Sequence, residues 1–330
     1  MSNYTLAMVT FTSSFITSLI ALPPIMRLMR EKGIVGIDFH KLNRPKIPEM
    51  GGLGALVGIT VSTILTTLIS PELAPKLVSF LLTMLIAGVI GAIDDLKPLS
   101  AKIKPILTAT AGIPILLMRT YSPYMILPIV GRTRLTIVYP FLIIPAIAVT
   151  SNAVNMMDPF NGTMTGTCSI ITVVLLLSAI LLGHEDAVIM CAGLLGGLLA
   201  LWYFNRYPSK VFVGDVGTLS VGAALGAIAI IGRMEVIAVV AFMPQIMNAF
   251  YGLSTIGRLY ERREVARPVH LSEDGRLIAS LDPKAPITLA RMVLARGPLT
   301  EPEAVRVFLA LSAISGALAL FTTYLMLAIS

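Results

Sequence analysis

The chain has 330 residues, of which 56% are hydrophobic and only 13% charged, and its mean hydropathy is +0.86. Soluble globular domains carry about one quarter charged residues, so this composition excludes a freely soluble protein. The net charge of +7 does not by itself indicate nucleic-acid binding, because in so apolar a chain the placement of basic residues matters more than their sum. The two cysteines, Cys168 and Cys191, are too few for a disulfide framework or a zinc site.

Ten charge-free stretches follow one another along the chain, and they predict ten membrane-spanning helices. A helix that crosses the hydrocarbon core needs about 20 apolar residues, and only the fourth stretch is clearly shorter than this. The stretches are residues 1–26, 50–71, 77–93, 105–118, 135–157, 159–184, 187–205, 216–232, 236–257 and 307–330. We therefore predict an all-α polytopic membrane protein with about ten transmembrane helices, forming a single integral membrane domain over residues 1–330.

The basic residues are concentrated in alternate loops, which predicts the orientation of the chain. Twenty of the 25 lysines and arginines lie in residues 27–49, 94–104, 206–215 and 258–306, on the same side as the 152–162 turn. The positive-inside rule places these loops in the cytoplasm and both termini outside. The uncharged segment 120–131 contains two prolines and a glycine, so we interpret it as an outer loop and not as an eleventh span. In the long cytoplasmic loop 258–306, residues 285–296 predict a short interfacial helix.

Two adjacent carboxylates, Asp94 and Asp95, end the third predicted span. Like charges at a membrane boundary repel each other unless a cation or a phosphate network compensates them. Lys102 and Lys104 follow within ten residues and could neutralise the acids or bind phosphate. The alternative is a solvated helix end with no chemical role.

Two further polar groups are expected at the same membrane face. Asn152, Asn155 and Asp158 are spaced by three residues, so they are predicted to share one face of a helix. Asp215 follows Gly214 immediately before a charge-free span. Amide and carboxylate oxygens suit Mg²⁺ or Mn²⁺ held together with substrate phosphates. Interhelical hydrogen bonding by the asparagines and simple helix capping by Asp215 are the alternatives.

Together these groups favour a metal-assisted reaction on a phosphorylated substrate at the lipid headgroup level. A secondary transporter is the competing class, but transporters place ionisable residues near the bilayer midplane on broken helices. Here the polar groups lie at one edge of the predicted spans.

Four motifs in order resemble the polyprenyl-phosphate N-acetylhexosamine-1-phosphate transferase family. They are residues 91–105 (GAIDDLKPLSAKIKP), 152–162 (NAVNMMDPFNG), 207–215 (YPSKVFVGD) and 47–49 (IPE). The third motif and residues 242–245 (FMPQ) are most similar to the dolichyl-phosphate N-acetylglucosaminephosphotransferases of eukaryotes and archaea. The bacterial phospho-N-acetylmuramoyl-pentapeptide transferases are less similar.

The resemblance implies a ten-span enzyme that transfers N-acetylglucosamine-1-phosphate from UDP-N-acetylglucosamine to polyprenyl (dolichyl) phosphate and releases UMP, the first membrane step of lipid-linked glycan synthesis for N-glycosylation. It implies a metal site, Mg²⁺ or possibly Mn²⁺, at Asn155 and Asp215, and catalytic roles for Asp94, Asp95 and Lys104. The substrate-binding residues it implies are Asn161, Glu49, Phe39, Asp158, Lys102, Arg267 and His270. Asn161 would contact the uracil, Arg267 the diphosphate and His270 the sugar region.

The sequence leaves several alternatives open. The same chemistry could use a different UDP-N-acetylhexosamine for a cell-envelope glycan, and a homodimer is possible. The membrane would be the cell membrane in an archaeon or bacterium and the endoplasmic reticulum in a eukaryote.

Overall fold

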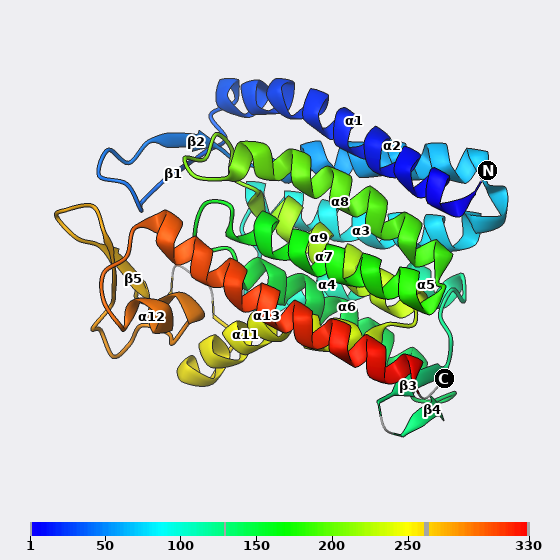
Figure 1. The fold of residues 1–330 in the computed structure, drawn as a ribbon. Helices are drawn as coiled ribbons and strands as arrows, with labels where there is room; N and C mark the ends of the chain where they lie inside the picture. Colours follow the sequence, from blue (N-terminus) through cyan, green and yellow to red (C-terminus); the bar gives the residue numbers. More distant parts are fainter. Residues whose placement is uncertain (1, 129, 261–263, 329–330) are drawn as a thin grey trace.

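The computed structural model describes residues 2–128, 130–260 and 264–328, and most of them are helical. Eight helices of the described chain are long and apolar enough to cross a membrane. In Figure 1 they lie side by side with their long axes in roughly one direction. They are α1 (Asn3–Glu31), α2 (Gly52–Ile69), α3 (Ala74–Leu96), α6 (Tyr139–Met156), α7 (Thr163–Leu182), α8 (Glu185–Asn205), α9 (Gly214–Ile231) and α13 (Glu301–Leu327).

The other two charge-free stretches are helical but broken. The ninth forms α10 (Glu235–Ala241) and α11 (Met243–Ile256), which meet at an angle of 65°. The fourth forms α4 (Ile103–Thr110) and α5 (Ile113–Leu117). At 1.5 Å per residue this fourth stretch is shorter than the roughly 30 Å hydrocarbon core. The described chain thus has eight spanning helices, or nine with the bent pair, where the sequence predicted about ten.

Three small antiparallel hairpins lie outside the bundle. They pair β1 (Val35–Ile37) with β2 (Lys46–Pro48), β3 (Tyr124–Leu127) with β4 (Gly131–Arg134), and β5 (Val269–Leu271) with β6 (Leu277–Ala279). The uncharged segment 120–131 contains β3 and no helix among its described residues. The interpretation of this segment as a loop is therefore confirmed.

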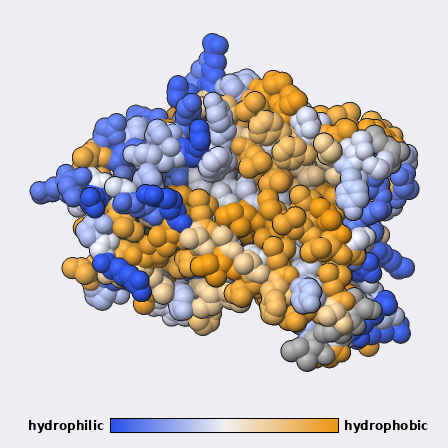
Figure 2. Space-filling model, in the orientation of Figure 1, coloured by the Kyte–Doolittle hydropathy of each residue, from blue (hydrophilic) through white to orange (hydrophobic). Residues whose placement is uncertain are grey.

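The two ends of the bundle differ in what they carry. Figure 1 shows both chain termini and β3–β4 at one end, and β1, β2, β5 and α12 (Leu289–Leu294) at the other. Figure 2 shows apolar side chains in a broad band across the middle of the molecule and hydrophilic residues toward both ends. This is the surface of an integral, multi-pass membrane protein. Which end faces the cytoplasm stays a prediction.

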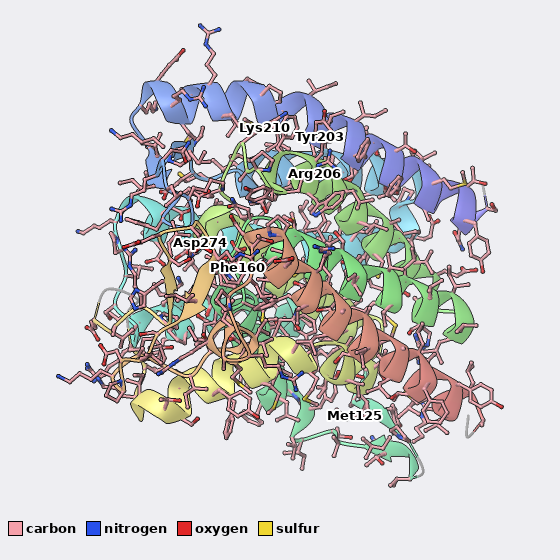
Figure 3. The ribbon with its side chains drawn as sticks, turned by 60° about the vertical axis from the view of Figure 1, so that its left-hand side comes forward. Met125, Phe160, Tyr203, Arg206, Lys210 and Asp274 are labelled. Carbon is pink, nitrogen blue, oxygen red and sulfur yellow. The ribbon has the colours of Figure 1, made fainter. Side chains whose placement is uncertain are left out.

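Aromatic and basic side chains gather where α8 ends. Figure 3 shows Tyr203, Arg206 and Lys210 close together there. The Arg206 guanidinium lies 5.3 Å from the Trp202 ring and 5.5 Å from the Tyr203 ring, and Lys210 Nζ lies 5.7 Å from the Tyr203 ring. Such groups are typical of the boundary between lipid and water.

Helix α9 is the buried centre of the bundle and packs against α3, α6, α2 and α8. Its first turn approaches α3 most closely at Gly91. A Cβ atom added at Gly91 would lie 2.3 Å from the carbonyl oxygen of Asp215 and 2.6 Å from Cα of Val216. Gly91 therefore allows the end of α3, with Asp94 and Asp95, to lie directly against the start of α9.

We expect Gly91→Ala to destabilise the protein by about 1–3 kcal/mol, since the new methyl group would meet backbone that cannot rotate away. Thermal unfolding of the detergent-purified protein measures this. Gly193→Ala in α8 is the matched control, because its nearest neighbour on another helix would be the Cγ2 methyl group of Thr10 at 3.2 Å, and no backbone atom would lie closer. Equal melting temperatures for the two variants would contradict the tight crossing.

The loop 258–306 has a small apolar cluster of its own. Val269, Leu277, Ala290 and Leu294 pack with residues of the α6–α7 connection and the start of α13. The predicted helix over 285–296 is present as the shorter α12. Its position at the membrane interface stays a prediction. Residues 261–263 of this loop lie outside the described residues.

Candidate active site

Four helices bring the predicted polar residues together around the Lys104 ammonium group. Lys104 Nζ lies 2.6 Å from Asp94 Oδ2 and 3.3 Å from Asn155 Oδ1, and it pairs with Asp215 Oδ2. The Asn155 amide nitrogen donates to Asp215 Oδ1 at 2.7 Å and to Thr218 Oγ1 at 2.8 Å. The side chain of Asp215 is 30% exposed and that of Asp94 only 8%. Asp215 is therefore the acid of this group that a ligand reaches most easily.

Asp95 faces a different partner from its neighbour Asp94. Its two carboxylate oxygens accept hydrogen bonds from the backbone nitrogens of Asp215 at 2.7 Å and Val216 at 3.0 Å. These nitrogens belong to the first turn of α9, where helical backbone N–H groups have no internal acceptor. Asp95 thus fixes the start of α9, and with it the position of the Asp215 side chain. Gly214 has a φ of +74° next to this contact, a conformation that favours glycine.

Glu49 adds a further acidic group beside this helix start. It follows β2, and its carboxylate is close enough to Asp95 to repel it. Burial raises the pKa of Glu49 from its ordinary value of 4.5. Four carboxyl groups therefore lie in this region, those of Glu49, Asp94, Asp95 and Asp215. Lys104 contacts only two of them, Asp94 and Asp215.

Because the pKa of Glu49 is raised by folding, the folded protein binds more protons than the unfolded chain just above pH 4.5. The ionised carboxylate therefore destabilises the fold as the pH rises. We expect Glu49→Gln to raise the melting temperature more at pH 8 than at pH 4.5. A melting temperature difference that is the same at both pH values would show that burial does not disfavour the ionised Glu49.

A second buried polar cluster lies around Asn161, and it joins loops far apart in the sequence. The Asn161 side chain donates to Asp38 Oδ2 at 3.0 Å, and its backbone nitrogen donates to Glu301 Oε1 at 2.8 Å. Lys41 pairs with Asp38 and lies 3.5 Å from Glu301 Oε2. Burial raises the pKa of Asp38, but hydrogen bonds from Lys41 and Asn161 outweigh it, so the pKa is lowered overall. Asn161 therefore belongs to a different cluster from Asn155.

Four residues of these two clusters were not predicted from the sequence as site residues: Asp38, Lys41, Glu301 and Thr218. Asp38 and Glu301 are nearly fully buried charged residues, and each is hydrogen-bonded to Asn161, more than 100 positions away. No local spacing reveals such pairs. Thr218 had a usable signal, since it follows Asp215 by three residues on the same helix face.

The prediction that Asn152, Asn155 and Asp158 share one helix face is wrong. Helix α6 ends at Met156, so Asp158 lies beyond it. Asp158 instead accepts a hydrogen bond of 3.3 Å from the backbone nitrogen of Met164 in the first turn of α7. Asn152 donates to Thr108 Oγ1 at 2.8 Å and joins α6 to α4. The break follows from Pro159, which disfavours helical backbone in the residue before it.

The remaining predicted substrate-binding residues lie outside these two clusters. The Arg267 guanidinium stacks on the Phe39 ring at 3.9 Å, which brings the loop before β5 to the loop after β1. His270 Nε2 lies 3.2 Å from Ser280 Oγ, across the β5–β6 hairpin. Lys102 is exposed at the start of α4. Their roles stay predictions.

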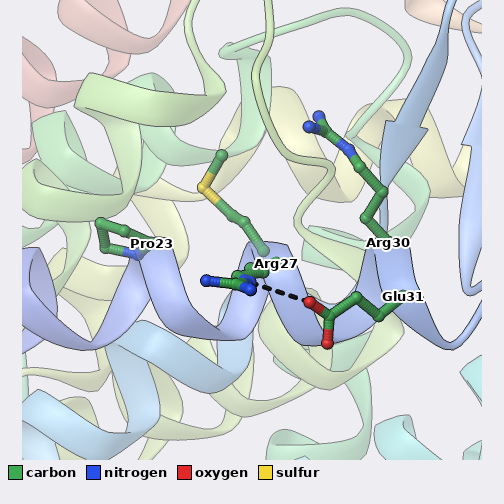
Figure 4. A pocket seen from close by; sticks show the side chains of 5 residues that line it. Pro23, Arg27, Arg30 and Glu31 are labelled. Atoms are coloured by element: carbon green, nitrogen blue, oxygen red, sulfur yellow. Dashed lines mark hydrogen bonds and ion pairs between the residues drawn. The ribbon is translucent and has the colours of Figure 1, made fainter.

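Two cavities of the described chain lie away from the Lys104 cluster (Lys104, Asp94, Asn155 and Asp215). One of about 430 Å³ lies along α1 and is shown in Figure 4, where Arg27 pairs with Glu31 at 2.8 Å. The other, of about 640 Å³, lies at the end of the bundle that carries the termini.

The residues around Lys104 fit a divalent cation that is shared with a substrate. Among the described residues there is no group of three or more His, Cys, Asp or Glu side chains that could hold a metal ion. Asp94, Asn155 and Asp215 nevertheless direct three oxygens to one point, now occupied by the Lys104 ammonium group. Mg²⁺ is usually bound by a small number of protein oxygen ligands when substrate phosphates complete its coordination. This donor set therefore fits Mg²⁺ or Mn²⁺ bound with phosphates and not a closed protein cage.

Fold and site together define a class: a multi-pass membrane protein with acidic, amide and lysine side chains at one end of its bundle. The sequence pattern of glycosyl transferase family 4 matches residues 77–233, which include Asp94, Lys104, Asn155 and Asp215. A protein of Methanocaldococcus jannaschii named "Putative glycosyltransferase" is 30% identical over 312 residues, 93% of this chain and 94% of its own. The chain therefore belongs to glycosyl transferase family 4.

Two other relatives have more specific names. A Saccharolobus solfataricus protein named "Putative UDP-N-acetylglucosamine--dolichyl-phosphate N-acetylglucosaminephosphotransferase" is 29% identical over 250 residues, 73% of this chain and 76% of its own. The phospho-N-acetylmuramoyl-pentapeptide-transferase of Desulfotalea psychrophila is 30% identical over 240 residues, 64% of this chain and 66% of its own. The family to which the chain belongs is thus one of membrane glycosyl-1-phosphate transferases.

Proposed function

We propose that the chain transfers N-acetylglucosamine-1-phosphate from UDP-N-acetylglucosamine to a polyprenyl (dolichyl) phosphate and releases UMP. The observation that supports this most is the meeting of Lys104 with Asp94, Asn155 and Asp215 where four helices end at one face of the bundle. A lipid phosphate and a water-soluble nucleotide can meet at that depth. The relatives named for dolichyl phosphate favour this acceptor.

The transfer makes one phosphorus–oxygen bond and breaks another. An oxygen of the lipid phosphate attacks the β-phosphorus of the UDP-sugar. The bond from that phosphorus to the bridging oxygen breaks, and UMP leaves with the electron pair. A lipid phosphate has a second pKa near 6, so at neutral pH it is mostly ionised and needs no protein base.

Phosphoryl transfer depends on positioning and on neutralising charge. Bound Mg²⁺ would neutralise the charge that builds on the leaving UMP. Asn155 and Asp215 would hold that ion, and Lys104 would hold a diphosphate oxygen once substrate separates it from the acids. Asp94 keeps Lys104 in place, and Asp95 keeps the α9 start in place. These two acids accordingly act as positioning groups.

Seven residues form the proposed substrate-binding surface around this centre. Asn161 would contact the uracil, and Phe39 with Arg267 would border the nucleotide and its diphosphate. The others are Glu49, Asp158, Lys102 and His270. Support for this surface comes from the stacking of Arg267 on Phe39, because a bound nucleotide between two loops needs both loops to be held together.

The test is UMP release by the purified protein with polyprenyl phosphate and a panel of UDP-sugars, with and without a chelator. We expect release only with the lipid phosphate present, fastest with UDP-N-acetylglucosamine, and abolished by the chelator. A preference for the pentapeptide-linked N-acetylmuramoyl nucleotide would instead favour the bacterial-type reaction. The name of the Desulfotalea psychrophila relative supports this alternative. Solute flux into sealed vesicles without UMP production would overturn the proposed enzyme function and indicate a transporter.

A further inference from the structure

A cavity of about 640 Å³ lies at the end of the bundle opposite to the Lys104 cluster. It opens between the ends of helices α3, α5, α8 and α9, next to the chain termini. The charged side chains and the one histidine that line it are Lys76, Arg119, His184, Glu185, Asp186 and Arg233. None of them takes part in the proposed transfer reaction.

The cavity concentrates positive charge at the end of the protein that has least of it. Three of the five basic residues in the predicted outer loops line this one cavity. Its two acids already have partners, because Asp186 pairs with Lys76 at 2.5 Å and Glu185 accepts a hydrogen bond from Asn3. The guanidinium groups of Arg119 and Arg233 form no ion pair or hydrogen bond with another described residue. Two cationic groups are thus available to a ligand.

Both arginines are held in a backbone conformation that favours glycine. The φ angle is +51° at Arg119, after α5, and +55° at Arg233, after α9. In each case the next residue donates its backbone nitrogen back into the helix, Thr120 to Ile115 at 3.2 Å and Met234 to Ala229 at 2.8 Å. Glycine is the usual residue at such helix ends. A basic side chain at any position of the last turn would interact favourably with the helix dipole. The dipole therefore does not explain why arginine occupies these two positive-φ positions.

The wall of the cavity also contains an unsatisfied polar atom. His184 Nδ1 is buried and has no hydrogen-bond partner among the described residues. Burial lowers the pKa of His184, and the nearby Arg233 and Lys76 add to this shift, which outweighs the opposite effects of Asp186 and of the Gly232 backbone. A buried nitrogen without a partner is expected where a ligand or an ordered water completes the site.

We propose that this cavity binds a phosphate group, with Arg119 and Arg233 as its main ligands and Lys76 and His184 at its edge. Planar guanidinium groups bind phosphate oxygens in pairs, which suits two arginines that enter from different helices. The phosphate could belong to a phospholipid headgroup of the adjacent leaflet or to a soluble anion, since both present the same oxygens.

The test titrates the full-length, delipidated protein in a zwitterionic detergent with dioleoylphosphatidylglycerol, and separately with sodium phosphate, followed by native mass spectrometry. We expect the double variant Arg119→Gln/Arg233→Gln to lower the affinity for the anion at least tenfold. Arg132→Gln/Arg134→Gln is the matched control, because it removes the same charge at the same end, from β4 next to Tyr124. It should keep the wild-type affinity within about twofold.

A second variant separates ligand binding from folding. Arg119→Gly/Arg233→Gly should melt at the wild-type temperature or higher without ligand, because glycine fits the positive φ angles, and yet lose the anion. Binding of the lipid alone would identify a headgroup site, and displacement of the lipid by sodium phosphate would identify a site open to soluble anions. Failure of the wild type to bind either probe, or equal losses in the cavity and control variants, would overturn the proposal.

Discussion

Replacing Asp215 by asparagine is expected to lower UMP release about 100-fold or more while the protein stays folded. The substitution keeps the size of the side chain and one oxygen acceptor but removes the charge that would hold the divalent ion. Loss of one such electrostatic contact in phosphate or acyl transfer typically costs a factor of 100 to 1,000. Lys104 remains paired with Asp94 at 2.6 Å, so little stability should be lost.

Two measurements make this result specific to Asp215. UMP release reports the activity, and the melting temperature in detergent reports the fold. Glu31→Gln is the control, since Glu31 is an exposed acid of α1 that pairs only with Arg27 among the described residues. A variant Asp215→Asn that retains most of its activity would exclude Asp215 as a metal ligand.

Replacing Lys104 by methionine is the second large effect we expect, and it concerns stability as well as activity. Asp94 and Asp215 would then lie near each other without a counter-charge. Removing one partner of a largely buried ion pair typically costs about 3 kcal/mol. Activity should also fall by a factor of about 100, because fixed positive charge on the diphosphate is lost.

Mg²⁺ should reverse part of the stability loss. In Lys104→Met the three oxygens of Asp94, Asn155 and Asp215 have no ammonium group between them, so added Mg²⁺ should raise the melting temperature more than in the wild type. The double variant Asp94→Asn/Lys104→Met should recover stability without metal. Lys32→Met, which changes an exposed lysine with no proposed role, should change neither property. If Mg²⁺ shifted all four proteins equally, the cation would not bind at this cluster.

The sequence was sufficient to predict where the helices lie and that the charged loops meet, although it predicted about ten spans and the described chain has eight or nine. Charge-free stretches identify helices because burying a charge in lipid is costly, and all ten stretches are helical. Alternation of the loops then brought Asp94, Asn155 and Asp215 to one face, where the structure has them in contact with Lys104.

What the sequence did not predict depends on packing between distant segments. Composition cannot show that α10 and α11 meet at 65°, although Pro244 in the first turn of α11 is compatible with the break. The adjacent acids Asp94 and Asp95 look equivalent in the sequence. They differ because the tight contact at Gly91 turns one toward Lys104 and the other toward the α9 backbone. The cluster of Asp38, Asn161 and Glu301 likewise exists only once three distant loops are folded together.

The separate apolar cluster under β5, β6 and α12 has an evolutionary consequence. Val269, Leu277 and Leu294 pack with one another, with the start of α13 and with Met157 and Phe160 of the α6–α7 connection. The turn between the two strands lies outside this cluster. The family pattern ends at residue 233, before this loop begins. Relatives that share the proposed phosphate chemistry could therefore differ in this turn, and with it in the proposed contacts to the nucleotide-sugar.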